Sequence, residues 1–242
     1  MPSEPRFPDV MLLAAGLGSR LLPLTADRPK PLVEVAGPPL LDHVVRNAAA
    51  EGFSRFVVNA CYRAEQLEAH VKTLGEAQPA LHFAVSREAE LLDTGGGVKR
   101  ALPLLTGDPI LVMNTDAFWP HGADRPLTRL VEWFGRGDTD MVMLCAQPRR
   151  AIGFRRSHDF CLDPRGVLTR DFGQPVIYAG ALLVRRQLVE AETAEKFSLY
   201  PLMEAAIEAG RLMGVVLDAP WLHVGDPAAL QEAEALLAAP AH

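Results

Sequence analysis

A segment near the amino terminus combines bare glycines with two cations, a combination suited to binding phosphate. Gly16 and Gly18 follow a short apolar run, and Arg20 comes two residues after the second glycine. Lys30 stands between two prolines, which restrict the backbone on both sides of it. Arginine binds phosphate oxygens through paired hydrogen bonds, and lysine supplies a point charge. We therefore expect a site for a phosphorylated ligand; a surface loop with two solvated cations is the alternative interpretation.

This segment does not match the two common phosphate-binding loops. The dinucleotide fingerprint needs a third glycine where the chain has Leu21, and neither GxxxxGKS nor GxxxxGKT occurs. Proline cannot continue a helix interior, and three prolines follow within eleven residues of Leu21. Ala14–Leu32 is therefore predicted to be a long rigid loop that binds phosphate with its own cations.

A carboxylate at the end of a later apolar run could hold a metal ion. Asp116 closes the run Pro109–Asp116, which is predicted to be a strand. Open α/β sheets bind ligands at the carboxyl ends of their strands, so this side chain should point into the ligand crevice. Mg²⁺ binds a few carboxylates together with phosphate oxygens. The alternative is that Asp116 only begins the next turn.

Two further segments could contact the base or ribose of a nucleotide. The string Asp93–Gly97 is predicted to precede a helix, and its glycines would let the backbone approach a flat ligand closely. The candidates here are Thr94, Gly95 and Gly96, but a flexible turn with Thr94 as a helix cap is also possible. Asn59, at the end of a predicted strand, could touch the base or make local turn bonds instead.

Apolar periodicity predicts an α/β sheet that would bring these residues to one edge. The predicted strands are Asp9–Ala15, Phe56–Ala60, His82–Ser86, Pro109–Asp116, Met141–Ala146, Val176–Val184 and Met213–Leu217. The predicted helices are Leu40–Glu51, Ala64–Leu74, Val98–Leu105, Leu127–Phe134, Leu199–Ala209 and Pro227–Leu237. The alternation implies a Rossmann-like, mostly parallel mixed sheet flanked by helices. Phe154–Thr169 should form an irregular or antiparallel insertion, and such insertions often form one wall of a substrate pocket.

Composition argues against several classes of protein. The net charge is -6, from 24 Lys and Arg against 30 Asp and Glu, which weighs against a general nucleic-acid binder. Three scattered cysteines form no CxxC pair and favour a reducing, cytoplasmic compartment. The longest uncharged stretch, Phe172–Val184, is too short for a bilayer span of roughly 20 residues. We expect a soluble protein with no nucleic-acid or membrane partner; its oligomeric state cannot be predicted from this sequence.

The string Leu13–Leu40 closely resembles the signature of the sugar-1-phosphate nucleotidyltransferases, a GxGxR element followed by a PKPL element. The similarity continues through Asp93–Gly97, Asn114–Asp116, Val176–Val184 and Trp221–Asp226. Within the family, the chain is most similar to the short members that transfer a uridylyl group to N-acetylmuramic acid 1-phosphate. Longer members carry a C-terminal β-helix of hexapeptide repeats, and this sequence contains no such repeats.

The resemblance implies an enzyme that moves a nucleotidyl group from a nucleoside triphosphate to a sugar-1-phosphate, releasing pyrophosphate and depending on a metal. UTP and N-acetylmuramic acid 1-phosphate are the favoured pair; dTTP with glucose 1-phosphate, or GTP with mannose 1-phosphate, are the alternatives. It also implies one domain, with residues 9–146 as the nucleotide-binding core. Residues 147–242 would form a small C-terminal sugar-phosphate side and a closing helix.

The resemblance also implies roles for individual residues. The nucleotide would be cradled by Ala14, Ala15, Gly16, Leu17 and Gly18. Arg20 would grip the outgoing phosphates, and Lys30 would stabilise charge on the α-phosphate or on the attacking phosphate. Asp116 matches the metal-binding aspartate of the family. The candidates on the sugar-phosphate side are Asn114, Asp159, Gly180 and Lys196, although Gly180 could mark a bulge and Lys196 could be solvated.

The chain departs from the family at the second metal ligand. Most relatives carry an aspartate at the position of His223, whereas Mg²⁺ prefers oxygen and imidazole suits later divalent ions. Either His223 ligates the metal, or Asp226 replaces it, or Asp116 holds the metal alone. If His223 ligates, Mn²⁺ or Co²⁺ should support activity at least as well as Mg²⁺, and protonation of the imidazole should lower activity. A packed core histidine beside Trp221 is the remaining interpretation.

Three other functions are alternatives to this one. A metal-dependent glycosyltransferase would use a DxD string, but Asp138–Asp140 precedes the strand Met141–Ala146 and so lies at the wrong end of the sheet. A nicotinamide dehydrogenase would need the third glycine that the loop lacks. A nucleotide-sugar sensor without turnover is the non-enzyme alternative, because His223 departs from the family pattern.

Overall fold

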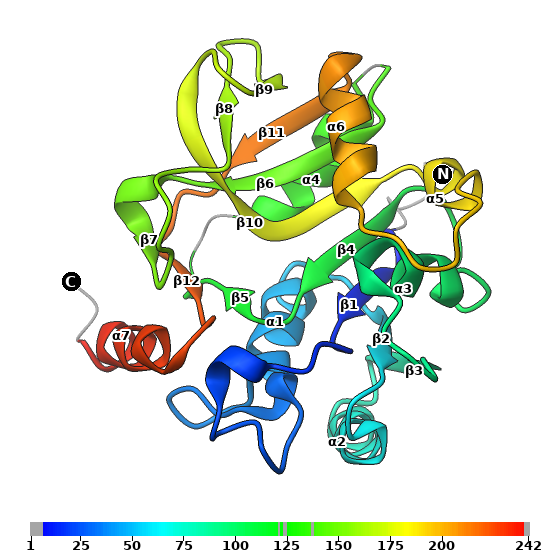
Figure 1. Ribbon diagram of the computed structural model, residues 1–242, viewed down its shortest axis with the longest axis vertical. Helices are drawn as coiled ribbons and strands as arrows, with labels where there is room; N and C mark the ends of the chain where they lie inside the picture. The colour runs from blue at the N-terminus through cyan, green and yellow to red at the C-terminus, as the bar shows by residue number, and fades with distance from the viewer. Residues whose placement is uncertain (1–6, 121, 123–124, 137, 240–242) are drawn as a thin grey trace.

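One large sheet runs through the molecule with the strand order β11-β6-β10-β4-β1-β2-β3 (Figure 1). The computed structural model describes residues 7–120, 122, 125–136 and 138–239. The strands are β1 (Val10–Leu13), β2 (Arg55–Ala60), β3 (His82–Arg87), β4 (Ile110–Asn114), β5 (Ala117–Phe118), β6 (Met141–Ala146), β7 (Ala151–Ile152), β8 (Phe160–Leu162), β9 (Leu168–Thr169), β10 (Gln174–Val184), β11 (Leu212–Val216) and β12 (Trp221–His223). The α-helices are α1 (Leu40–Ala49), α2 (Ala64–Ala77), α3 (Asp93–Ala101), α4 (Pro126–Phe134), α5 (Arg186–Glu190), α6 (Tyr200–Glu208) and α7 (Pro227–Ala238).

The pairing of the strands confirms the predicted mixed, mostly parallel sheet. β1 lies parallel to β2 and β4, β2 is parallel to β3, and β6 is parallel to β11. Only β10 runs against its neighbours along this order, pairing antiparallel with both β4 and β6. The carboxyl ends of β1, β2 and β4 therefore meet at one edge of the sheet, where a Rossmann-like fold binds its ligands.

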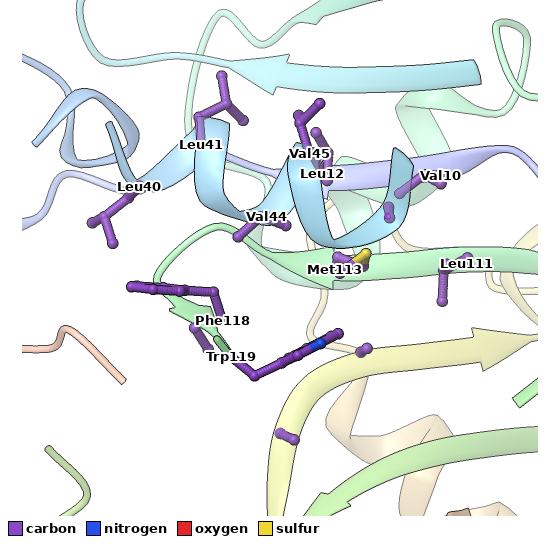
Figure 2. Packing of buried hydrophobic residues seen from close by; sticks show 14 of the residues in the cluster. Val10, Leu12, Leu40, Leu41, Val44, Val45, Leu111, Met113, Phe118 and Trp119 are labelled. Carbon is purple, nitrogen blue, oxygen red and sulfur yellow. The ribbon is translucent and has the colours of Figure 1, made fainter. Parts of the chain in front are cut away.

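Helices cover the sheet on both faces because alternate strand residues point to opposite sides. Val10 and Leu12 of β1 join a core formed with α1, α2 and α4, whereas Met11 joins a second core formed with α3 and α6. Figure 2 shows Val44 and Val45 of α1 packed over β1 and β4. The predicted helical spacing of α1 is thus explained by the apolar face that it buries.

The start of α3 corrects one prediction. The helix was expected over Val98–Leu105 after a glycine-rich turn, but it begins at Asp93 and contains Gly95, Gly96 and Gly97. Glycine is a poor helix former, so local preference alone places this boundary later. Close neighbours override that preference: a Cβ on Gly95 or Gly96 would lie 2.3 Å from the Phe197 ring or from the Glu195 carbonyl, respectively.

The second half of the chain adds two small antiparallel features. β8 pairs with β9 and with β10, which confirms an antiparallel insertion within Phe154–Thr169. A separate three-stranded sheet, β5-β12-β7, was not predicted. Its strands have two or three residues each, too few to show a periodic pattern. Figure 1 shows α7 beside β12 and β7, at some distance from the large sheet.

None of the helices in the described part of the chain is both long and apolar enough to cross a membrane.

Candidate active site

A cavity of about 630 Å³ opens at the carboxyl ends of β1, β2 and β4. This volume is within the range typical of small-molecule sites. Its lining comes from several separate parts of the sequence. The lining residues are Leu13, Ala14, Ala15, Gly16, Leu17, Gly18, Ser19, Arg20, Lys30, Pro31, Asn59, Glu88, Leu91, Asp93, Thr94, Asn114, Thr115, Asp116, Lys196 and Gly225.

The glycine-rich loop folds back on itself at Gly18. This residue has a φ of 66°, which glycine adopts without steric cost. A Cβ at this position would lie 2.8 Å from Lys30 Cβ and 3.0 Å from Thr25 Cγ2, and Thr25 Oγ1 donates a hydrogen bond of 2.8 Å to the Gly18 carbonyl. The absence of a side chain at Gly18 therefore allows the second arm of the loop to bring Lys30 against the first.

The tip of the same loop is held by the start of α2. The Tyr62 hydroxyl donates to the carbonyls of Thr25 and Ala26, and an Arg63 guanidinium nitrogen donates to the Ala26 carbonyl at 2.8 Å. Short 3-10 turns occur at Ser19–Leu21 and Lys30–Leu32, and the described loop contains no α-helix. The prediction of a long loop in place of a helix is confirmed.

Three cations surround the cavity. Lys30 is mostly buried, and its Nζ lies 2.6 Å from Asp116 Oδ2. Arg20 and Lys196 are exposed and line the cavity, and neither makes an ion pair within the described ranges of the chain. Two side chains are thus free to meet an anionic ligand, and the third is already placed beside a carboxylate.

Asp116 and His223 are brought together by the small sheet. Asp116 directly precedes β5, and His223 ends β12, where it pairs with Ala117. The Val224 amide donates to the Asp116 carbonyl at 2.8 Å, and His223 Nε2 lies 3.7 Å from Asp116 Oδ2. Burial raises the pKa of Asp116, but contacts with His223 and Lys30 outweigh it and hold the pKa well below its usual range. Asp116 is therefore ionised at any physiological pH.

The imidazole of His223 is fixed in orientation by stacking. Its ring lies 5.6 Å from that of Trp221 at an interplanar angle of 6°, and Trp221 Nε1 donates to the Ala179 carbonyl at 3.0 Å. A Cβ on Gly225 would lie 2.9 Å from His223 Cε1, so this glycine leaves room for the ring. His223 Nδ1 is buried and has no hydrogen-bond partner in the described structure. His223 therefore packs beside Trp221, as one interpretation predicted, and its Nε2 also faces Asp116.

The residues at this point fit a divalent cation that also binds phosphate. Asp116 supplies an ionised carboxylate, and His223 presents Nε2 on the same side, while His, Cys, Asp and Glu form no larger ligand cluster in the described residues. Mg²⁺ and related ions commonly take one or two protein ligands and complete their shell with water and phosphate oxygens. Asp226 is elsewhere: its carboxylate caps α7 by accepting from the Ala229 amide at 2.8 Å.

On the predicted nucleotide side, the structure brings some candidates to the cavity and not others. Asn59 and Thr94 line it, together with the whole segment Ala14–Gly18. Gly95 and Gly96 are buried inside α3 and do not line it. The Thr94 hydroxyl accepts a bond of 2.9 Å from the Leu199 amide rather than capping α3.

The predicted sugar-phosphate residues divide in the same way. Asn114 and Lys196 line the cavity, whereas Asp159 and Gly180 do not. The expectation that Phe154–Thr169 forms one wall of a pocket is wrong for this cavity, because none of those residues lines it. Asp159 Oδ2 accepts from the Tyr178 amide at 3.0 Å. Gly180, with a φ of 82°, lies where the register of β10 and β6 shifts, so the bulge interpretation describes it.

Sequence comparison with known proteins identifies the family of this chain. Residues 9–150 match the model of the nucleotidyl transferase family. The chain is 37% identical to an N-acetylmuramate alpha-1-phosphate uridylyltransferase of Caulobacter vibrioides over 94% of this chain and 96% of the relative. It is 31% identical to the protein of the same name from Neisseria meningitidis serogroup B, over 95% of this chain and 98% of the relative. The chain belongs to the nucleotidyl transferase family.

Solved structures support the family fold. HddC from Yersinia pseudotuberculosis complexed with GMP-PN has a TM-score of 0.74, covering 96% of this chain and 100% of that one, at 21% identity. A UDP-glucose pyrophosphorylase complexed with UDP-glucose has a TM-score of 0.73 at 14% identity, covering 95% of this chain and 97% of the other. The protein is a transferase with the Rossmann-like fold of other nucleotidyltransferases.

Sequence reasoning missed part of this nucleotidyltransferase site. Glu88 lines the cavity one residue after β3, and Asp93 lines it with a φ of 63° at the start of α3. The position of Glu88 after a predicted strand was a usable signal, because β3 ends at the same edge as β1 and β2. The left-handed backbone of Asp93 left no trace in the sequence, since most non-glycine residues avoid that conformation.

The DxD string, Asp138–Asp140, lies at the opposite end of the sheet from the cavity, as its position in the sequence predicts. Asp140 Oδ2 accepts from Arg211 Nε at 2.7 Å at the amino end of β6, and it does not line the cavity of about 630 Å³. The glycosyltransferase alternative therefore has no support from this segment.

Proposed function

We propose that this enzyme transfers a uridylyl group from UTP to N-acetylmuramic acid 1-phosphate, producing the UDP-sugar and pyrophosphate. The two relatives carrying that name align over 94% and 95% of this chain, and over almost their whole length. A mannose-1-phosphate guanylyltransferase subunit of Danio rerio is less similar, at 28%, and the alignment covers only 61% of it. Uridylyl transfer is therefore favoured over the guanylyl alternative.

One observation carries the proposal: Lys30 Nζ lies 2.6 Å from Asp116 Oδ2 in a cavity that Arg20 and Lys196 also line. Both substrates are multiply anionic, and their phosphates repel one another until cations bring them together. A site lined by three cations, one of them held beside Asp116, meets that need. It has no evident use for an uncharged substrate.

The reaction needs no covalent intermediate with the protein. An oxygen of the sugar phosphate attacks the α-phosphorus of UTP, and a new phosphorus–oxygen bond forms. The bond from the α-phosphorus to the oxygen that bridges to the β-phosphate breaks, and that oxygen leaves with pyrophosphate. Catalysis of this kind consists mainly of alignment and charge stabilisation.

Each cation has a role that follows from its position. Arg20, on the glycine-rich loop, would bind the phosphates that leave as pyrophosphate. Lys30, which packs against Gly18 and lies beside Asp116 in the cavity lining, would stabilise charge at the α-phosphate. Lys196, on the segment before α6, would bind the incoming sugar phosphate, with Asn114 of β4 also lining the cavity. Together they would hold the two substrates in line.

A divalent metal would be held by Asp116 and His223. When bound there, such an ion supplies further positive charge to the phosphates and helps to orient them. The carboxylate of Asp116 is ionised and ready to bind, and stacking on Trp221 fixes the direction of His223 Nε2. Because one ligand is an imidazole, Mn²⁺ or Co²⁺ should serve at least as well as Mg²⁺.

The proposal is tested by a matrix of nucleoside triphosphates against sugar-1-phosphates, with pyrophosphate release as the readout and Mg²⁺, Mn²⁺ and Co²⁺ in parallel. The largest kcat/KM is expected for UTP with N-acetylmuramic acid 1-phosphate. A larger value for dTTP with glucose 1-phosphate, or for GTP with mannose 1-phosphate, would replace the substrates but keep the reaction. Binding of nucleotide without pyrophosphate release from any pair would instead indicate a sensor.

A further inference from the structure

A chain of hydrogen bonds runs through Asn59 and Glu88, which line the cavity, and joins two segments of its lining. On one side lie residues 14–18, the glycine wall; on the other lie residues 91–94, the helix wall. The Ala14 amide donates to Asn59 Oδ1 at 2.6 Å, Asn59 Nδ2 donates to Glu88 Oε1 at 2.6 Å, and the Leu92 amide donates to Glu88 Oε2 at 3.2 Å. Asn59 and Glu88 thus link the glycine wall to the helix wall.

The polarity of this chain fixes both side chains. Asn59 is 3% exposed and Glu88 is 5% exposed. If the Asn59 amide were turned over, its nitrogen would face the Ala14 amide and its oxygen would face a carboxylate, so only one orientation is satisfied. Both polar ends of Asn59 are therefore engaged with protein groups. This arrangement favours a role for Asn59 in linking the two walls over a direct contact with the base of a nucleotide.

The third glycine of α3 provides independent support. A Cβ on Gly97 would lie 2.7 Å from Asn59 Nδ2 and 2.9 Å from Glu88 Oε1. The helix therefore packs directly on the hydrogen bond between these side chains. A methyl group at Gly97 would push the pair apart, so the residue type at this position is explained by the tie itself.

We propose that Asn59 and Glu88 are positioning residues that fix the separation of the glycine wall and the helix wall and thereby set the affinity for the nucleotide. The inference rests on the proposed function, since it takes a nucleoside triphosphate as the ligand between these walls. The base and ribose would lie between backbone groups of the two walls. A change in wall spacing would weaken that contact without removing any cation from the phosphates.

Single substitutions break the chain without changing its size. Asn59→Asp sets a carboxylate against Glu88, and Glu88→Gln sets an amide donor against either Asn59 Nδ2 or the Leu92 amide. An unpaired buried polar group costs free energy, so each substitution should loosen the link between the two walls. We therefore expect KM and Kd for UTP to rise roughly tenfold in each variant. The kcat at saturating UTP should change much less, because Arg20, Lys30 and Asp116 keep their places.

The double variant N59D/E88Q separates positioning from direct contact. In it, the carboxylate introduced at position 59 accepts from the Ala14 amide and from the side-chain amide introduced at position 88. The oxygen of that side-chain amide accepts from the Leu92 amide. Every bond is restored with one reversed in direction, and the net charge equals that of the wild type. We expect Kd for UTP, measured by calorimetric titration in MgCl₂, to return to within about threefold of the wild type.

Matched controls remove the effect of stability. Asn47 is 3% exposed and exchanges hydrogen bonds with the Trp119 main chain; Glu51 is 5% exposed and accepts from two amides in the first turn of α4. Asn47→Asp and Glu51→Gln should lower the melting temperature and leave Kd for UTP unchanged. The inference is overturned if both single variants at Asn59 and Glu88 bind UTP as the wild type does, or if the double variant binds no better than they do. A wild type that binds UTP but releases no pyrophosphate would contradict the proposed reaction and leave this inference standing.

Discussion

Lys30 and Asp116 are 86 residues apart in the sequence, and their side chains meet at 2.6 Å in the cavity. The lysine comes from a loop that closes through Gly18, and the aspartate comes from the short connection between β4 and β5. The contact holds an ammonium group in the lining of the cavity before any substrate binds. The same oxygen, Asp116 Oδ2, is also the carboxylate atom nearest to His223 Nε2, so one carboxylate oxygen faces both side chains.

Removing the ammonium group should impair the chemistry more than the fold. We expect Lys30→Ala to lower kcat by about 100- to 1,000-fold, because a positioned charge at the reacting phosphate is lost. Lys72→Ala is the matched control, since Lys72 is an exposed lysine on α2 that pairs only weakly with Glu76 at 3.9 Å. Pyrophosphate release measures the rate, and circular dichroism checks the fold. Wild-type turnover in the Lys30→Ala enzyme would remove Lys30 from the reaction.

The shared carboxylate predicts competition between Lys30 and a metal ion. In the free protein the ammonium group neutralises Asp116, so Lys30→Met should tighten Mn²⁺ binding on the order of tenfold. The measurement is the free Mn²⁺ signal in electron paramagnetic resonance, without nucleotide. Asp116→Asn should abolish the same binding. If Lys30→Met binds Mn²⁺ no more tightly than the wild type while Asp116→Asn abolishes binding, the metal does not compete with Lys30.

The sequence was sufficient for the large sheet because its strands are continuous apolar runs and the helices between them show a clear helical period. The strand at Met141–Ala146 matches β6 at both ends, and the strand at Val176–Val184 lies within β10. Its limits show at α3, where the glycines are packed by Phe197 and Glu195, which lie far away in the sequence. A contact at that separation cannot be read from local preference, which places glycines in turns.

Site residues could be predicted where they belong to a distinctive sequence motif. Gly18, Lys30 and Asp116 were singled out because the loop is unusual and because strand ends collect ligands, and all three line the cavity. The partner of Asp116 was harder, since His223 reaches it through β5 and β12, which have two and three residues. Glu88 was missed although it follows a predicted strand, because its role depends on a hydrogen bond to Asn59 that no spacing in the sequence reveals.

The imidazole of His223 predicts a particular choice of metal. His223→Asp would replace nitrogen by oxygen, the donor that Mg²⁺ prefers, so the ratio of the Mn²⁺-supported rate to the Mg²⁺-supported rate should fall roughly tenfold. His223→Ala should raise the concentration of each metal needed for half-maximal rate. Metal-dependence curves recorded by pyrophosphate release give both quantities. Coincident curves for the wild type and His223→Ala would show that the metal is held without His223.

The ionisation of Asp116 predicts how stability changes with pH. Its pKa is lowered in the folded protein relative to an unfolded value of about 3.9, so it stabilises the fold above that pH and loses this effect as the pH falls toward the folded value. Asp116→Asn should therefore melt below the wild type at pH 7, by roughly 3 °C for each kcal/mol lost, and the gap should narrow below about pH 4. Thermal melts between about pH 3 and pH 7 test this. A gap that stays constant over that range would mean that the interaction does not depend on the charge.

Substitution of Gly18 can separate the effect of backbone strain on stability from the effect of a displaced Lys30 on catalysis. Gly18→Ala adds a φ penalty of roughly 1–2 kcal/mol and a methyl group 2.8 Å from Lys30 Cβ, so both the stability and kcat should fall. Gly107 is the matched control, because its φ is 83° and a Cβ there meets nothing within 4 Å. Gly107→Ala should lose similar stability in denaturant unfolding and keep its turnover, because the strain there displaces no cation. If Gly18→Ala loses stability but keeps the wild-type kcat, the added methyl group does not disturb the reaction. The close packing of Gly18 against Lys30 would then not be what positions the Lys30 ammonium group.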